Sequence, residues 1–349
     1  MKNVIALVSC TIAVLSASFA PRQGASGPAS SLRYNITELG VPPGYTGSEG
    51  HALNASGQAV GYVSKGASHL RACLWEGGRA KILGTLGDAD SSSEAYGINA
   101  SGDVVGYSYA QGGRYAFVVR GGQMTNLGAL GSASDSEARA INSKGQVCGY
   151  SQFGDGSQGF LHDNGEMVGL GSLGGVRGKA WGINTAGHVV GETTIKRYDS
   201  GDRAFLWKDG KMSDITPVGS ESGVAQAIND TGQTVGFFFD KGRQQYRTFL
   251  YSGGTAHDLG VLPGTRDTRP KAINNRGQIV GFAYGDGKDE VRPRACLYQN
   301  GKWRDLNDLL PAHSGWRLHI AWSINGKGQI VGDGTHNGQH RGFLLTPHE

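Results

Sequence analysis

One short motif recurs seven times along the chain and constrains its fold more than any other feature. Each copy has a small residue, an aliphatic residue, Asn, two turn residues and Gly, then a short apolar run and a second Gly. The seven Asn residues are Asn54, Asn99, Asn142, Asn184, Asn229, Asn274 and Asn325. Successive Asn residues are 45, 43, 42, 45, 45 and 51 positions apart. A period of this length with short apolar runs is typical of a propeller or a solenoid.

Each repeat unit contains four strand-like segments. In the second unit these are Glu94–Asn99, Val104–Ser108, Tyr115–Val119 and Met124–Gly128. The Asn-X-X-Gly element joins the first two, because Asn opens a turn through its side chain and Gly adopts the left-handed conformation. Gly accounts for 59 of the 349 residues without a Gly-X-Y period, which fits turns and strand ends and excludes collagen. Four antiparallel strands in about 45 residues predict a propeller blade.

The two ends of the repeat region indicate a closed ring. The last unit stops after its third strand, Gly342–Leu345, and the first is preceded by an unpaired fourth strand, Tyr34–Gly40. The N-terminal strand is therefore expected to complete the last blade and remove an open sheet edge. An open solenoid would need end caps and would gain nothing from a split repeat. We predict an all-β fold, a seven-bladed β-propeller of four-stranded blades, in a single domain over residues 34–349.

The N-terminal segment predicts export. Lys2 precedes an apolar run, and small residues stand before Pro21, so residues 1–20 are read as a signal peptide cleaved after Ala20. The run is too short for a membrane span, which needs about 20 apolar residues. Residues 21–33 are expected to form a flexible lead-in, and the protein to be secreted or periplasmic. The three cysteines that follow the predicted signal peptide, Cys73, Cys148 and Cys296, occupy apolar strand positions and are expected to be small buried residues.

The repeated motifs also resemble a known family. Ile-Asn-X-X-Gly-X-Val-Val-Gly-Tyr alternates with Arg-Ala-Phe-Leu-Trp and Asp-Leu-Gly-X-Leu-Gly, and this alternation resembles the HAF repeat family of extracellular repeat proteins. In this chain the His of the namesake His-Ala-Phe is replaced by Arg71, Arg203, Arg294 and Arg341 in four units. The resemblance implies an exported protein and no particular reaction.

The most variable positions of the repeat are the candidate site. The residue three before each Asn is large and variable, whereas the residue two before each Asn is always Ala, Gly or Ser. These residues are His51, Tyr96, Arg139, Trp181, Gln226, Lys271 and Trp322. Glu94, Glu137 and Arg269 stand five before their Asn and are added as candidates. Variation on a constant scaffold is typical of a binding site in a repeat protein. The alternative is that these side chains only pack between blades.

Charge divides these candidates around the ring. Units one to three bring mainly acidic residues, such as Glu94 and Glu137, whereas units four to six bring a basic arc. The residues of this arc are Lys179, Arg197, Arg203, Arg243, Arg247, Arg269, Lys271, Arg292 and Arg294. The basic arc favours a polar or anionic ligand, since Arg binds anions and stacks on aromatic rings. A solvated face of mixed charge is the alternative.

We predict a secreted binding or interaction module whose ligand is a glycan, a polyanion or a protein at the channel face. The alternative is a propeller hydrolase or lyase that acts on extracellular polysaccharide with His51, Glu94, Glu137 and Arg139. No Gly-X-Ser-X-Gly element and no metal-ligand spacing occurs in the sequence, so no catalytic residue, metal site or cofactor is predicted. The formal charge of +4 gives no case for nucleic-acid binding. We expect a monomer without a membrane span.

Overall fold

The fold is taken from a computed structural model of the chain. It describes residues 32–348 except 67–68, 111, 134, 155, 198–200 and 286–291. The predicted signal peptide and nearly all of the predicted lead-in lie outside the described residues. All strands belong to the unit Arg33–Glu349. No helix in the described part of the chain is long and apolar enough to cross a membrane.

The described residues form seven four-stranded antiparallel sheets, as predicted. Each sheet is one blade, numbered in chain order. The first strands are β2 (Gly47–Leu53), β6 (Ser93–Ile98), β10 (Asp135–Ile141), β14 (Gly178–Ile183), β18 (Gly223–Ile228), β22 (Thr265–Ile273) and β26 (Trp316–Ile324). The second strands are β3 (Ala59–Lys65), β7 (Val104–Ala110), β11 (Val147–Phe153), β15 (Val189–Thr193), β19 (Thr234–Asp240), β23 (Ile279–Gly285) and β27 (Ile330–His336).

The outer half of each blade repeats with the same regularity. The third strands are β4 (His69–Glu76), β8 (Gly113–Arg120), β12 (Gly156–Asp163), β16 (Arg203–Lys208), β20 (Gln245–Ser252), β24 (Arg294–Gln299) and β28 (Gln339–Pro347). The fourth strands are β5 (Arg79–Gly84), β9 (Gln123–Gly128), β13 (Glu166–Gly169), β17 (Lys211–Asp214), β21 (Thr255–Gly260), β25 (Lys302–Asp305) and, for blade 7, β1 (Tyr34–Glu38). A short 3-10 helix, η1 (Asn307–Leu309), follows β25.

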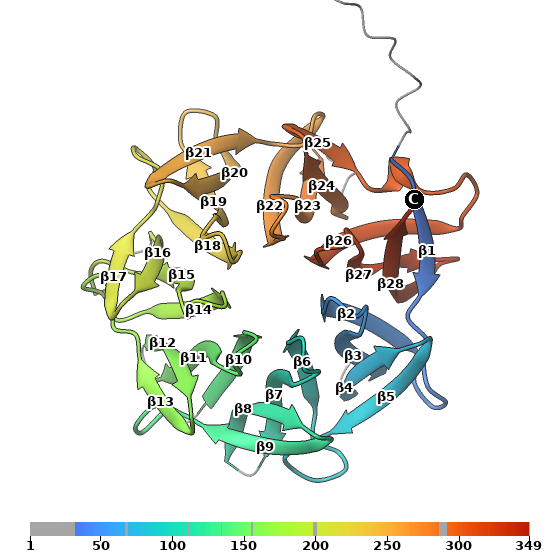
Figure 1. Cartoon of the computed structure of the whole chain (residues 1–349), viewed down its shortest axis with the longest axis horizontal. Coiled ribbons are helices and arrows are strands. Elements are labelled where there is room, and N and C mark those ends of the chain that lie inside the picture. Colours follow the sequence, from blue (N-terminus) through green and yellow to red (C-terminus); the bar gives the residue numbers. More distant parts are fainter. Residues whose placement is uncertain are drawn as a thin grey trace, which may run out of the picture. The chain divides into compact units, whose positions relative to one another are not determined.

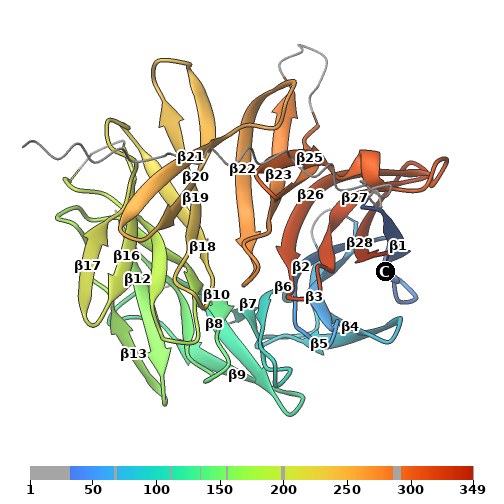
Figure 2. The same cartoon turned by 45° about the horizontal axis from the view of Figure 1, so that its top comes forward.

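The seven sheets are arranged as a ring around a central axis. The first strand of every blade faces the centre and the fourth strand lies at the periphery (Figure 1). In the tilted view the sheets stand side by side around the ring, with turns at both of their ends (Figure 2). This order places the seven variable residues of the first strands nearest to the axis.

The N-terminal strand closes the ring, as the split repeat predicts. Strand β1 pairs antiparallel with β28, with Tyr34 opposite Pro347 and Glu38 opposite Phe343. The Arg341 side chain donates to Glu38 across this pair at 3.0 Å. Leu39, which follows β1, is buried in the apolar cluster between blades 7 and 1. The first and last parts of the repeat region therefore share one sheet.

The repeat Asn residues also close the ring, through a cycle of hydrogen bonds between neighbouring blades that sequence analysis did not predict. Each Asn donates from Nδ2 to the backbone carbonyl of the Asn in the next blade, at distances between 2.9 and 3.4 Å. The last of these hydrogen bonds runs from Asn325 to Asn54 at 3.0 Å, so the set is cyclic. The side-chain Oδ1 of the same Asn accepts backbone N–H groups within its own turn, as in Asn142. One residue type thus fixes both the turn and the contact between blades.

Packing between blades supplies the core. The third strand of each blade places Phe or Cys at one equivalent buried position: Cys73, Phe117, Phe160, Phe205, Phe249, Cys296 and Phe343. Cys73, Cys148 and Cys296 are free and buried, which confirms their expected role as small apolar residues. Gly145 in the third Asn-X-X-Gly turn has φ +82°, the left-handed conformation predicted for it.

Candidate ligand-binding cavity

A β-bulge occurs at the same position of the first strand in all seven blades. In blade 1 the register shifts between Gly50 and Ala52, so His51 has no partner in β3. The bulged residues of the seven blades are His51, Tyr96, Arg139, Trp181, Gln226, Lys271 and Trp322. A bulge leaves one residue unpaired and re-aims its side chain. The large variable residue of each unit is therefore the residue that the backbone turns out of the regular pleat.

The bulged side chains meet at one central cavity of about 710 Å3. All seven line it, together with Glu94 and Arg269. Glu137, the tenth candidate, is not among the lining residues. The structure thus brings nine of the ten predicted residues to one place, and ligand binding by them stays a prediction. The cavity volume is within the range of small-molecule binding pockets, about 300–1,000 Å3.

Glu49 and His51 form an ion pair in the wall of this cavity. His51 Nε2 lies 3.1 Å from Glu49 Oε1, and His51 Nδ1 lies 3.0 Å from the carbonyl of Ala95. Both nitrogens face acceptors, which requires both to carry protons. Burial by itself would lower the pKa of His51, but the Glu49 carboxylate raises it above its usual value. Burial opposes ionisation of Glu49 as well, yet His340, His51 and the Tyr62 hydroxyl lower its pKa.

The two predicted carboxylates, in units two and three, already form hydrogen bonds or ion pairs with neighbouring side chains. Glu94 accepts the hydroxyl of Tyr96 at 2.9 Å and that of Tyr107 at 2.5 Å. Glu137 is only 2 % exposed and pairs with Arg114 at 2.5 Å and with Arg139. A buried carboxylate held by two guanidinium groups is a structural ion-pair network. Glu94 and Glu137 therefore do not form the pair of free carboxylates that acid–base catalysis on a glycoside requires.

The uncompensated charge of the cavity lies on blade 6. Within the described part of the chain, Arg269 and Lys271 make no ion pair, and Arg269 Nε is buried without a hydrogen-bond partner. The Lys271 ammonium lies 4.6 Å from the centre of the Trp322 ring, and Arg269 lies over the ring of Tyr246. Burial and the charges of Arg139 and Arg269 lower the pKa of Lys271 to about 8.

Glu192 faces the same cavity from β15. Burial and, second, the charge of Asp202 raise its pKa to about 7, whereas Lys179 acts in the opposite direction. Near neutral pH this carboxyl is therefore close to half protonated. The remaining acids of the lining, Glu49 and Glu94, are bound by His51 and by tyrosine hydroxyls. The region around Arg269 and Lys271 is thus the part of the cavity with excess positive charge.

In the structure some residues of the predicted basic arc form ion pairs away from the cavity, and others line the cavity. Three of its arginines begin or lie in third strands and pair with an Asp of the neighbouring fourth strand. These pairs are Arg203–Asp214 at 2.9 Å, Arg247–Asp258 at 2.8 Å and Arg294–Asp305 at 3.4 Å. Each pair joins the third and fourth strands of its blade. Arg243 likewise pairs with Asp240 at 2.8 Å. Arg269 and Lys271 remain as the arc residues that line the cavity.

Sequence analysis missed a second ring of variable residues. The residue after each Val-Val-Gly element pairs across the blade with the residue five before Asn; in blade 4, for example, Glu192 is opposite Lys179. The ring comprises Tyr62, Tyr107, Tyr150, Glu192, Phe237, Phe282 and Asp333. In blades 4 and 7 this position is acidic instead of aromatic, and that variation in the sequence could have identified the ring.

Comparison with known families corrects the predicted resemblance. A family model described as "Protein of unknown function (DUF3466)" matches residues 175–343. The prediction of the HAF repeat family was wrong, because the matching family is this uncharacterised one. No curated protein matches the chain.

Solved structures share the fold at low sequence identity. The β-propeller domain of the Trilobed protease from Pyrococcus furiosus is 10 % identical with a TM-score of 0.57, over 87 % of this chain and 94 % of that domain. The acylaminoacyl peptidase of Pyrococcus horikoshii is 12 % identical with a TM-score of 0.56, over 87 % of this chain and 52 % of its own. TolB from Acinetobacter baumannii is 9 % identical with a TM-score of 0.47, over 83 % of this chain and 63 % of its own. The chain thus spans less than two thirds of the peptidase and of TolB. The similarity to the Trilobed protease domain and to the acylaminoacyl peptidase shows a shared β-propeller fold.

Proposed function

We propose that this protein is a binding module whose central cavity takes a small anionic ligand, with a carboxylated or sulfated saccharide as its chemical class. The observation that carries the proposal is the convergence of all seven bulged side chains on one cavity with uncompensated cations on one wall. A packing role alone would not require large residues of such varied chemistry at the same bulge of the seven blades. It would also not require partly buried cations without counter-charges, because removing an unpaired charge from water is costly.

The position of the cations indicates how the ligand would be held. An anionic group placed between Arg269 and Lys271 would supply the counter-charge that the wall lacks. Arg269 Nε, which is buried without a partner, would gain an acceptor. The Trp322 ring beside Lys271 offers an apolar surface on which a sugar face can stack. The proposed ligand therefore has an acidic group and an adjacent flat apolar face.

Export and the oligomeric state belong to the same proposal. The apolar run near the N-terminus favours a secreted or periplasmic protein, where acidic glycans are available as ligands. We propose that it acts there as a monomer. The enzymatic alternative is weaker, because Glu94, Glu137 and His51 are all engaged in internal hydrogen bonds or ion pairs.

The double variant Arg269→Ala/Lys271→Ala is expected to weaken binding of a uronic-acid oligosaccharide about 10- to 100-fold, which is about 1.4–2.7 kcal/mol. Binding by the parent should also weaken as salt rises, since about 0.15 M salt screens charges beyond about 8 Å. Titration calorimetry at two salt concentrations measures both effects. The matched control Lys208→Ala/Lys211→Ala removes the same charge from exposed positions of blade 4 and should bind as the parent does. Equal binding by parent and Arg269/Lys271 variant would place the site elsewhere, and no binding by the parent to acidic oligosaccharides would refute the ligand class.

Affinity for the same anionic ligand is expected to fall about tenfold between pH 7 and pH 9. Lys271, whose pKa is lowered to about 8, is cationic below that pH and neutral above it. The loss of its proton removes attraction for the anion, so affinity decreases as pH rises. Ionisation of Glu192 near pH 7 acts in the same direction. Calorimetry across this range tests the dependence, and Lys271→Arg, which stays charged, should flatten it above pH 8. A parent protein whose affinity is constant over the range would contradict the role of Lys271.

A further inference from the structure

Blade 7 departs from the other blades at three aligned positions. Six residues before the repeat Asn the other blades have Ser, Gly or Thr, whereas blade 7 has His319. After the Val-Val-Gly element five of the other blades have an aromatic residue and blade 4 has Glu, whereas blade 7 has Asp333. Before the first residue of the Arg-Ala-Phe element blade 7 has His340, and the other blades have no histidine there. Strand β26 also has a second bulge, between Leu318 and Ile320, at His319 itself.

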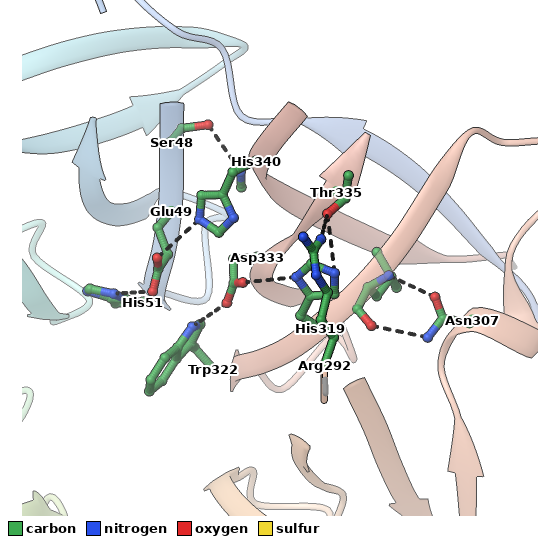
Figure 3. Close-up of polar contacts among 12 residues, drawn as sticks. Ser48, Glu49, His51, Arg292, Asn307, His319, Trp322, Asp333, Thr335 and His340 are labelled. Atoms are coloured by element: carbon green, nitrogen blue, oxygen red, sulfur yellow. Dashed lines mark hydrogen bonds and ion pairs between the residues drawn. The ribbon is translucent and has the colours of Figure 1, made fainter. Parts of the chain in front are cut away.

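The three substituted residues meet although they come from three strands. Figure 3 shows His319 of β26, Asp333 of β27 and His340 of β28 side by side. One potential ligand atom from each residue lies within 4.8 Å of the other two. His319 and Asp333 are buried and His340 is exposed, so the cluster is open to solvent on one side. An ion could thus enter the cluster from the side of His340.

His319 and Asp333 are close to each other but do not form a hydrogen bond. His319 Nδ1 lies 3.8 Å from Asp333 Oδ2, which is beyond hydrogen-bond distance. Two ligand atoms on one tetrahedral ion stand about 3.4 Å apart, given metal–ligand distances of about 2.0–2.2 Å. A shift of a few tenths of an ångström would therefore allow both atoms to bind the same ion.

Neighbouring contacts orient the side chains. His319 Nε2 lies 3.2 Å from Thr335 Oγ1, so the ring is held with Nδ1 toward Asp333. The Trp322 indole N–H donates to the other oxygen of Asp333 at 2.9 Å. Such outer hydrogen bonds commonly fix the orientation of metal ligands.

Charges of both signs surround the cluster. Asp333 contributes one carboxylate, and Glu49 Oε2 lies 3.3 Å from His340 Nε2 as a second. Arg292 donates to Thr335 at 3.2 Å and brings a positive charge close to the site, which opposes cation binding. Asp333 acts against this cost, whereas Glu49 shares its charge with His51; the imidazole ligands bind as neutral groups.

From this geometry we propose that His319, Asp333 and His340 bind a divalent transition-metal ion of the Zn2+ class, with one or more positions left to water. Two imidazole nitrogens and one carboxylate suit Zn2+ or Fe2+, whereas Ca2+ and Mg2+ prefer oxygen ligands only. The site lies behind the cavity wall, because Asp333 binds the indole of Trp322, which lines the cavity. It is independent of the anionic ligand proposed above.

The test is titration of the metal-stripped parent with ZnCl2 by calorimetry and with CoCl2 by visible absorption. One Zn2+ per chain is expected to bind, and Co2+ should give the absorption of a site with nitrogen and oxygen ligands. His319→Gln and Asp333→Asn should each weaken Zn2+ binding at least about tenfold. CaCl2 and MgCl2 should not compete at equal concentration.

The matched control is His69→Gln, since His69 is a partly exposed histidine of blade 1 that lies 3.8 Å from Asp90. It should bind Zn2+ as the parent does. Should the buried variants fail to fold, His340→Gln replaces them, because His340 is exposed and its substitution leaves the core intact. Absence of saturable Zn2+ binding by the parent would overturn the proposal. Undiminished binding by the folded cluster variants would do the same, as it would place the ion on other histidines.

Discussion

Deletion of residues 21–41 is expected to destabilise the protein by at least about 4 kcal/mol or to make it aggregate. The deletion removes β1, whose Tyr34 is buried, and Leu39, which packs between blades 7 and 1. Burial of one large apolar side chain contributes about 1.5–3 kcal/mol, and the ladder with β28 is lost in addition. The exposed edge of β28 would then be free to pair with another chain. Thermal and urea unfolding with light scattering measures both outcomes.

The control for this deletion is removal of residues 21–31 alone, which leaves β1 in place. The protein with this shorter deletion should have the same unfolding temperature as the parent. If the protein without residues 21–41 also unfolds cooperatively at that temperature, β1 does not close the ring.

Asn142→Ala is expected to lower the free energy of unfolding by about 2–4 kcal/mol. The side chain donates to the carbonyl of Asn184 in the next blade at 2.9 Å, and its Oδ1 accepts the N–H groups of Lys144 and Gln146 at 3.0 Å. Alanine would leave buried backbone groups without partners, and each such group costs about 1–3 kcal/mol. Urea denaturation followed by tryptophan fluorescence gives the measurement.

Asn35→Ala is the matched control, since Asn35 is an exposed residue of β1. Its effect should stay under about 0.5 kcal/mol. A denaturation midpoint for Asn142→Ala equal to that of the parent would mean that the cyclic set of Asn hydrogen bonds contributes nothing to stability.

The sequence by itself determined the propeller, its seven blades and the ring closure by the N-terminal strand, predicted over Tyr34–Gly40 and found over Tyr34–Glu38. These follow from short-range regularities: the Asn-X-X-Gly turn, alternation within strands and the split of the last repeat. It also identified the bulged residues, such as His51 and Lys271, because a constant scaffold makes one variable position visible. The blade-to-blade hydrogen bonds of the Asn residues had no such signal, since a turn motif looks the same with or without a partner in the next blade.

Only the tertiary structure decided which charges are free and which are paired. Sequence position placed Glu137 among the candidate ligand-binding residues, yet its carboxylate forms ion pairs with Arg114 and Arg139. Sequence position placed Arg203 in the basic arc, yet Arg203 forms an ion pair with Asp214. Likewise His319 and His340 are 21 residues apart in sequence and meet only because β26, β27 and β28 pair in one sheet and a bulge turns His319. The energy of a charge depends on its neighbours in space and on its distance from water, and those are set by strand register and blade packing.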